Sequence, residues 1–406
     1  MFAVTPKAAL AAALVAGLAS VVGCGQVLTS GELGWVGGTA RPSVGQGPVH
    51  VQWTERLTEP GTGSYQPVEH AVAALDPSHD RVYVGSSAGS LWALTPAGTK
   101  IWRYDAEGGI EAEPAVDGRN GEVYLGTTQG YVHALHASDG RVRWRKPIEG
   151  AIRNPPILSG DAVYVNTASD LVVAFSRESG EALWRYHRDP PDGFSLTGHA
   201  GMVLVDNKLL AAFSDGTLVA LDPADGHVVW ERDTALDLEE APEGATRFLD
   251  VDTTPVVLGS SVYIASFAAG FYEVALSSDS VRARDAARVG ITSIAVSDRA
   301  RSTEGEEGFM VLASADDGVV CLAMPDRTQM WAHHVSRGAA SIPKIYRDVV
   351  LVGENSGGFL ALAVGTGQEL SRVESGYGFS AEPAIADHLG FVVSNGGTLF
   401  AFSVVD

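Results

Sequence analysis

The chain has 406 residues, of which 45% are hydrophobic and 19% are charged, and this composition excludes both wholesale disorder and a small disulfide scaffold. A total of 28 Lys and Arg residues against 49 Asp and Glu residues gives a net charge of −21, which argues against nucleic acid as a partner. The 47 glycines indicate many turns rather than long helices.

Residues 1–23 have the pattern of a secretory signal peptide. Lys7 precedes an apolar run, Ala8 to Val22, that is too short to span a bilayer, and the run ends in Gly-Cys at Cys24. A small residue before a cysteine at this position is similar to the lipobox of bacterial lipoproteins, whose cysteine is lipidated and becomes the mature N-terminus. The alternative is an ordinary signal peptide with an incidental cysteine.

The lipobox resemblance implies that acyl chains on Cys24 anchor the protein firmly in a membrane. Gly25 stands where an inner-membrane retention signal usually places Asp, so the resemblance implies the periplasmic face of the outer membrane. Residues 24–47 are rich in Gly, Ser and Thr, which predicts a flexible tether. The remaining cysteine, Cys321, lies in an apolar run and is interpreted as a buried strand residue, with a reactive thiol as the alternative.

An internal repeat predicts the fold of residues 48–406. Eight similar segments end at residues 94, 135, 175, 221, 276, 322, 362 and 402, and a period near 40 is typical of a solenoid or propeller. Within one repeat, four short strand-like runs (114–116, 123–125, 131–135 and 141–144) are divided by turn signals. We therefore predict an all-β, eight-bladed β-propeller of four-stranded antiparallel blades.

The last repeat ends before any fourth strand, whereas Val49–Trp53 has strand alternation but no repeat of its own. We predict that this N-terminal strand closes the last blade, because closure removes an open sheet edge. A tryptophan follows most repeats, and we interpret these residues as packing between blades: Trp102, Trp144, Trp184, Trp230 and Trp331.

Turns such as Ala137–Trp144 resemble those of the eight-bladed propellers of quinoprotein dehydrogenases, from about residue 48 to the end. Within that group, Asp250–Val257 resembles a segment of the BamB family, outer-membrane lipoproteins of the β-barrel assembly machine. Phe194–Gly198 is similar to a second segment of that family, with Thr197 where the family has Arg. The resemblance implies a non-catalytic scaffold without a cofactor. It also implies a monomeric propeller that binds the barrel-bearing subunit of the machine.

Other functions have weaker support. The quinone-dependent dehydrogenases hold pyrroloquinoline quinone against a vicinal cysteine pair, and one cysteine alone remains here after processing. Residues 250–254 match a phosphatase nucleophile motif that needs a parallel α/β sheet, which the repeats do not offer. His333 and His334 would point to opposite faces of a strand, so they are expected at the surface or in packing rather than on a metal. A propeller that binds glycan or a signalling partner stays open.

Loop lengths predict where a partner binds. In an antiparallel blade, the connection to the next blade emerges on the face of the second-to-third turn. The insertions at 186–198 and 232–252 both follow a fourth strand, so they belong to one face of adjoining blades. The insertion at 297–308 separates a first from a second strand and belongs to the opposite face.

The two insertions on one face carry the segments that resemble the BamB family. We predict that Phe194 and Leu196 are apolar anchors for the partner. Asp250 and Asp252 are predicted to accept hydrogen bonds or to pair with a basic partner residue. The alternative is that these two carboxylates cap backbone N–H groups where the chain enters Thr253–Pro255.

Lipidation of Cys24 is testable by replacing its sulfur. The Cys24→Ser protein should leave the membrane fraction for the soluble fraction when cells without its partners are fractionated, because no other anchor is predicted. A Cys24→Ser protein that still sediments with membranes in such cells would contradict the prediction.

Overall fold

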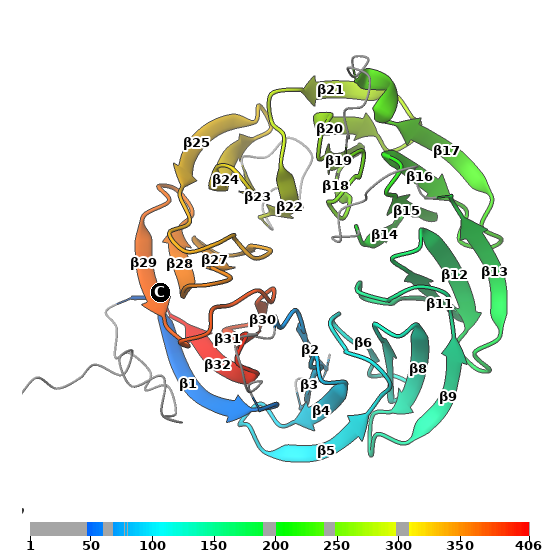
Figure 1. Ribbon diagram of the computed structural model, residues 1–406, viewed down its shortest axis with the longest axis vertical. Coiled ribbons are helices and arrows are strands. Elements are labelled where there is room, and N and C mark those ends of the chain that lie inside the picture. Colours follow the sequence, from blue (N-terminus) through cyan, green and yellow to red (C-terminus); the bar gives the residue numbers. More distant parts are fainter. Residues whose placement is uncertain are drawn as a thin grey trace, which may run out of the picture. The chain divides into compact units, whose positions relative to one another are not determined.

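The computed structural model describes residues 47–59, 68–76, 78, 80–189, 200–238, 248–297 and 308–405. The chain divides into two units, Met1–Arg41 and Pro42–Asp406, and every described residue belongs to the second. The second unit contains eight four-stranded antiparallel sheets that stand as blades around a central axis (Figure 1). The predicted eight-bladed β-propeller is therefore confirmed.

The first four blades follow the chain, each running from its innermost to its outermost strand. Blade 1 is β2 (Ala73–Leu75), β3 (Val82–Val84), β4 (Ser90–Leu94) and β5 (Lys100–Asp105). Blade 2 is β6 (Ala115–Asp117), β7 (Glu122–Gly126), β8 (Tyr131–His136) and β9 (Val142–Pro147). Blade 3 is β10 (Ile157–Ser159), β11 (Ala162–Asn166), β12 (Leu171–Ser176) and β13 (Ala182–His187). Blade 4 is β14 (Met202–Val205), β15 (Lys208–Ala212), β16 (Thr217–Leu221) and β17 (Val228–Asp233).

The last four blades continue in the same way, and blade 8 takes its outer strand from the N-terminal side of the unit. Blade 5 is β18 (Val256–Leu258), β19 (Ser261–Ser266), β20 (Gly270–Ala275) and β21 (Val281–Asp285). Blade 6 is β22 (Ile291–Val296), β23 (Gly308–Ser314), β24 (Gly318–Met324) and β25 (Thr328–His333). Blade 7 is β26 (Lys344–Tyr346), β27 (Val349–Gly353), β28 (Phe359–Ala363) and β29 (Glu369–Val373). Blade 8 is β30 (Ala384–Ala386), β31 (Leu389–Val393), β32 (Thr398–Val404) and β1 (Val49–Arg56).

The burial of each strand follows from its place in the blade. Middle strands such as β7 and β16 are buried along their whole length, because each of their two faces packs against a neighbouring blade. Outer strands such as β5 and β13 expose much of their length to solvent. Within the described ranges the one helical element is the 3₁₀ turn η1 (Ala235–Asp237), and none of the helical structure there has the length and apolar character needed to cross a bilayer.

The two ends of the described propeller meet in blade 8, as the sequence predicted. Strand β1 pairs antiparallel with β32, with Val49 opposite Val404 and Arg56 opposite Thr398, and it runs three residues beyond the predicted Val49–Trp53. The closing strand also contacts the following blade, because Glu55 forms an ion pair of 2.6 Å with Lys100. Strand β1 therefore joins the last blade to the first.

Tryptophans on outer strands join successive blades. Each donates its indole N–H to a backbone carbonyl in the turn between the third and fourth strands of the next blade, at distances of 2.7 to 3.2 Å. The six donor and acceptor pairs are Trp53 and Pro96, Trp102 and Ala137, Trp144 and Arg177, Trp184 and Pro223, Trp230 and Leu276, and Trp331 and Val364. The interpretation of the five predicted tryptophans as packing residues is confirmed, and Trp53 joins them.

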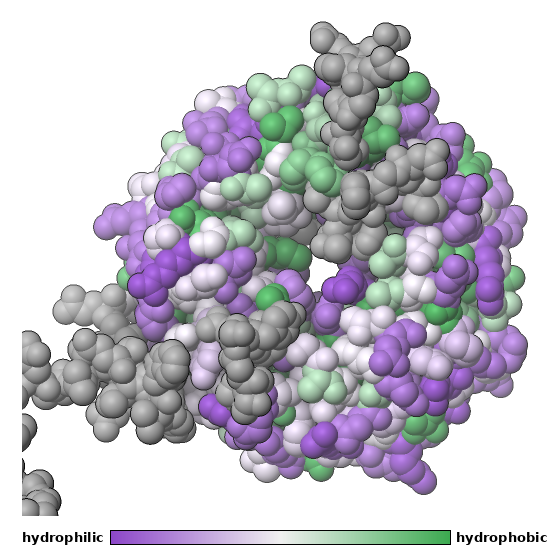
Figure 2. Space-filling view, in the orientation of Figure 1, coloured by the Kyte–Doolittle hydropathy of each residue, from purple (hydrophilic) through white to green (hydrophobic). Residues whose placement is uncertain are grey.

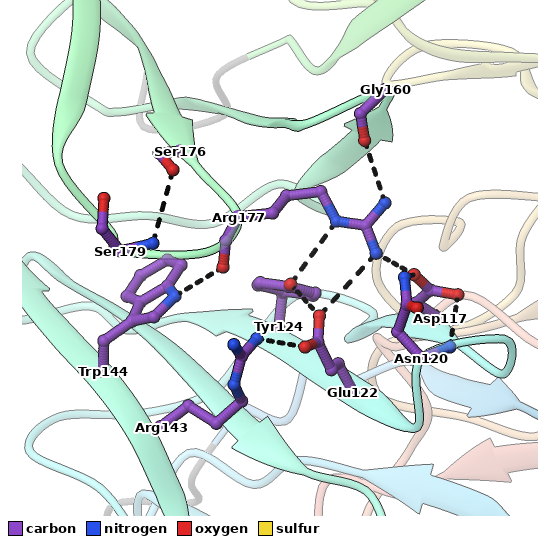
Figure 3. Close-up of polar contacts among 10 residues, drawn as sticks. All are labelled: Asp117, Asn120, Glu122, Tyr124, Arg143, Trp144, Gly160, Ser176, Arg177 and Ser179. Atoms are coloured by element: carbon purple, nitrogen blue, oxygen red, sulfur yellow. Dashed lines mark hydrogen bonds and ion pairs between the residues drawn. The ribbon is translucent and has the colours of Figure 1, made fainter.

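One junction shows the contact in detail (Figure 3). The Trp144 indole N–H donates to the Arg177 carbonyl at 2.8 Å, and the Arg177 side chain turns back to pair with Asp117 in the preceding blade. The Trp144 ring lies against Gly180, which has a φ of +70°. We call this space, bounded at each junction by an outer strand and the next blade's turn, the indole seat; here its residues are Trp144, Arg177 and Gly180.

Two further expectations from the sequence concern the same junctions. Cys321 is fully buried, its thiol lies 3.7 Å from the Val364 carbonyl, and burial raises its pKa to about 12, so it is a packing residue. His333 is half-buried with Nδ1 3.2 Å from the Gly367 carbonyl oxygen, whereas His334 is exposed. Both histidines lie where the sequence placed them, in packing and at the surface.

Trp53 tests the closure of the ring. Trp53→Ala should lower the free energy of unfolding by about 3 kcal/mol, measured by urea denaturation, because it opens a space between blades 8 and 1. Trp53→Phe is the matched control, since it keeps a ring and removes the N–H donor, and should cost only about 1 kcal/mol. Removing residues 1–54 should cost more than either substitution, and an unchanged unfolding midpoint in that truncation would contradict closure by β1.

Candidate functional site

The described ends of the long connections that follow blades 3 and 4 lie on one face of the ring. The chain leaves outer strands β13 and β17 and returns to inner strands β14 and β18 of the following blades, which lie side by side in the ring (Figure 1). The third insertion separates the first and second strands of blade 6, β22 and β23, as predicted, and residues 298–307 of it lie outside the described part of the chain. The described parts of the two long connections contain Arg188, Leu236 and Asp252, and we call the surface around these three residues the connection face.

Arg188 fastens the start of the first connection to blade 4. Its guanidinium donates to Asp215 at 2.6 Å, to Glu231 at 3.0 Å and to the Tyr186 hydroxyl at 3.1 Å. Although burial opposes the charge, these hydrogen bonds raise the pKa of Arg188 further above its ordinary value. The connection therefore leaves blade 3 from a fixed point.

The turn η1 begins the second connection and is held from three sides. The Asp237 carboxylate accepts hydrogen bonds from Arg232 and, at 3.0 Å, from the Tyr272 hydroxyl. Arg284 of blade 5 donates to the Asp237 carbonyl at 3.1 Å. These contacts hold Leu236 with 77% of its surface exposed, so the turn presents one apolar side chain to solvent.

The second connection ends in a segment that is bonded to both neighbouring blades. The Thr253 hydroxyl accepts the N–H of Ala265 and the Thr254 hydroxyl accepts the N–H of Gly201, each at 2.8 Å. The backbone carbonyl of Asp250 accepts the N–H of Phe267 at 2.9 Å. Threonine hydroxyls thus satisfy backbone N–H groups where the chain enters blade 5.

Asp250 and Asp252, predicted as partner contacts, lie together at this point. Asp250 is 2% exposed and Asp252 is partly buried. Burial, and after it the negative charge of Asp250, raise the pKa of Asp252 to about 7. The pair therefore carries less than two negative charges at neutral pH.

Other predicted site residues lie outside the described part of the chain, namely Cys24, Phe194 and Leu196. Sequence reasoning missed Leu236 and Arg188. Leu236 had a weak signal, an apolar residue between acidic ones inside an insertion, whereas nothing local distinguished Arg188 from other strand-end arginines.

Figure 2 shows an opening at the centre of the ring. A second group of charged side chains comes from residues on, or just before, the inner strands of three blades. Lys344 of blade 7 donates to Glu382 beside blade 8 at 3.2 Å. Burial raises the pKa of Glu113 of blade 2 to about 7, and the charges of Lys344 and Glu382 act on it in opposite directions. Charged residues of blades 2, 7 and 8 therefore interact with one another.

One group among the described residues has the ligand spacing of a metal site. Asp222, Asp225 and His227 place their ligand atoms within 4.8 Å of one another in an outer turn of blade 4. Asp225 already accepts the N–H of His227 at 3.1 Å and contacts its Nδ1 at 2.6 Å, which is the bonding of a tight turn. We assign no metal to it.

A rigid ring with loops held on one face defines a class of protein, the β-propellers that serve as binding scaffolds. A family model described as outer membrane protein assembly factor BamB matches residues 88–318. The chain belongs to this family.

Individual relatives agree with the family match. The outer membrane protein assembly factor BamB of Shewanella oneidensis is 23% identical over 86% of this chain and 87% of its own length. The protein of the same name from Burkholderia pseudomallei is 30% identical over 54% of each chain. The crystal structure of BamB from Moraxella catarrhalis matches with a TM-score of 0.71 at 22% identity, and the match covers 87% of this chain and 99% of that one.

The fold is shared with enzymes. A quinohemoprotein alcohol dehydrogenase from Comamonas testosteroni has a TM-score of 0.62 at 16% identity, covering 90% of this chain and 78% of the dehydrogenase. That likeness shows the fold alone. The curated relatives are assembly factors, which supports the predicted non-catalytic role.

The raised pKa of Asp252 predicts a pH-dependent stability. Its folded-state pKa of about 7 lies above the ordinary 3.8, so the folded chain keeps a proton that the unfolded chain releases. The free energy of unfolding should therefore fall as the pH rises from about 4 to about 7, by up to about 4 kcal/mol from this group. Asp252→Asn should remove this part of the fall, in urea denaturation measured across that range.

The matched control is Asp279→Asn, which changes an exposed turn carboxyl. It should keep the pH dependence of the unchanged protein. An Asp252→Asn variant whose stability falls as steeply with pH as that of the unchanged protein would contradict the raised pKa.

Proposed function

We propose that this protein is a non-catalytic scaffold that assists the assembly of β-barrel proteins into the outer membrane. The family match over residues 88–318 supports this role, and so does the similarity to assembly factors along most of the chain. The proposed partner is the barrel-bearing subunit of the assembly machine. The proposed location is the periplasmic face of the outer membrane, held by lipid on Cys24.

The observation that carries the docking site is the exposed Leu236. An apolar side chain on a free surface is common, but this one is 77% exposed on a turn held by Arg232, Tyr272 and Arg284. A side chain that is already ordered loses little entropy when a partner covers it. Leu236 therefore has the properties of an anchor residue in an interface.

The predicted residues complete this site. Phe194 and Leu196 belong to the neighbouring connection and would add apolar anchors on the same face. Asp252 can accept a hydrogen bond from the partner at its protonated or its ionised carboxyl. Asp250 is 2% exposed. It therefore contributes to the docking site through its negative charge beside Asp252 and through its bonds to the local backbone, and a direct contact with the partner would need the loop to rearrange.

Replacement of Leu236 tests the docking site. Leu236→Glu should weaken co-purification of the barrel-bearing subunit from solubilised outer membranes by about thirtyfold, the loss expected of an interface hot spot. The matched control is Leu183→Glu, because Leu183 is 56% exposed on outer strand β13, away from the connections. That control should co-purify the subunit normally.

The double variant Leu196→Ala with Asp250→Ala tests the predicted residues in the same assay. Loss of the subunit at an unchanged melting temperature would support their role, whereas a loss of several degrees would favour a structural role for Asp250. Normal co-purification by both the Leu236→Glu protein and the double variant would refute the connection face as the docking site.

A further inference from the structure

The repeat of indole seats breaks at two junctions. In strand register, Ala283 of β21 and Ser371 of β29 occupy the position that tryptophan holds in the other outer strands. Blade 5 therefore meets blade 6, and blade 7 meets blade 8, without an indole on that position. The two junctions differ in what lies there instead.

Between blades 7 and 8 the chain itself closes the seat. A Cβ added to Gly47 would lie 2.4 Å from the Leu370 carbonyl oxygen and 2.6 Å from the Ser371 Cβ, so the Gly47 backbone packs directly onto β29. Gly47, just before the closing strand, thus lies against the register position that an indole occupies at six other junctions.

Between blades 5 and 6 the turn residue has changed as well. At five junctions a glycine of positive φ lies against the indole: Gly98, Gly140, Gly180, Gly226 and Gly367. In blade 6 the corresponding residue is Arg327, with a φ of +61°. Its guanidinium reaches across the junction to Glu273 at 2.6 Å, so an ion pair joins the two blades.

A cavity lined in part by Arg327 lies between blades 5 and 6. These blades end in the outer strands β21 and β25 (Figure 1). The cavity has a volume of about 200 Å³. Residues of both blades line it, among them Phe271, Ala283, Asp285, Leu322, Asp326 and Arg327. Phe271 and Leu322 are almost fully buried, so they give the cavity an apolar floor below a charged rim.

The charged residues at the mouth of the cavity do not favour the binding of a small ion. Arg327 is paired with Glu273, and Arg288, which also lines the cavity, lies 3.4 Å from Asp285. A charged ligand would have to compete with these partners. Planar guanidinium groups over an apolar floor suit an aromatic ring, because arginine stacks on aromatic faces.

We propose that this cavity binds one aromatic side chain, foremost an indole, from an extended segment of another polypeptide. Six junctions of the same ring hold an indole in the equivalent place, each with a hydrogen bond to the carbonyl of the next blade's turn. Counting along the turn places the equivalent carbonyl on Met324. The volume is below the roughly 300–1,000 Å³ of pockets for drug-sized ligands, so it suits one side chain.

The source of the segment, though not the binding site, rests on the proposed function. Transmembrane barrel strands carry aromatic residues at both ends, so an unfolded barrel polypeptide presents such side chains in extended segments. Arg284 lines the cavity and also donates to the Asp237 carbonyl, so a client bound there would lie next to a subunit docked on the connection face.

Filling the cavity tests the inference. The probes are N-acetyl-tryptophanamide and a short soluble peptide with one central Trp, compared with the same peptide carrying Ala, and binding is followed by ligand-observed NMR. The full-length protein should bind the two Trp probes and not the Ala peptide. Ala283→Trp with Arg327→Gly rebuilds the common seat, so this double variant should raise the melting temperature and weaken Trp-peptide binding by about thirtyfold.

Ser371→Ala is the matched control, because it changes the same register position at the junction that Gly47 closes, and it should bind the Trp peptide normally. Ala283→Leu gives a second, smaller filling if the double variant fails to fold, and it should also weaken binding. Equal binding of the Trp and Ala peptides, or normal Trp-peptide binding by a folded filled variant, would overturn the inference.

Two other occupants give distinct results. Binding that appears only after residues 1–46 are removed would mean that the chain's own Trp35 takes the site. Binding that weakens as protein concentration rises would mean that a second copy takes it. Either result overturns the assignment to a separate polypeptide. The peptide assay needs no assembly machine. Either assay can therefore fail while the other succeeds, so failure of this inference is distinguishable from failure of the proposed function.

Discussion

The contact between an indole on one blade and a backbone turn on the next joins six of the eight pairs of neighbouring blades. A four-stranded blade cannot bury both of its faces, so each blade is stable only against its neighbours. The indole adds a directed hydrogen bond to that burial and fixes the rotation from one blade to the next. Trp53 repeats the contact where the chain ends meet, so the last junction is built like the first.

A ring joined in this way supports loops that need no core of their own. Arg188 and Asp237 hold the connections by hydrogen bonds to neighbouring strands and turns, and Leu236 is exposed on the turn that Asp237 anchors. An assembly factor and a quinohemoprotein dehydrogenase share this fold, so the fold alone does not set the function. Function in these propellers depends on what the loops and junctions carry rather than on the blades.

Departures from a repeat are informative because the other copies show what each position normally does. Ser371 and Ala283 both stand where the other outer strands have tryptophan, yet the Gly47 backbone packs against Ser371, whereas Ala283 borders a cavity. The ion pair between Arg327 and Glu273 joins blades 5 and 6 without replacing the volume of an indole. This junction therefore has an ion pair and a cavity where six others have an indole, and on this difference the proposed aromatic site rests.

The sequence by itself determined the number of blades, the strands within them and the closure by Val49–Trp53, because alternation, turn residues and a period near 40 are local signals. It also predicted the packing role of Trp102 and its equivalents. Only the tertiary structure decided that Leu236 is exposed, that the pKa of Asp252 rises, and that Ala283 borders a cavity. Exposure, desolvation and unfilled volume depend on residues from different blades, which lie too far apart in the chain for a local pattern to relate them.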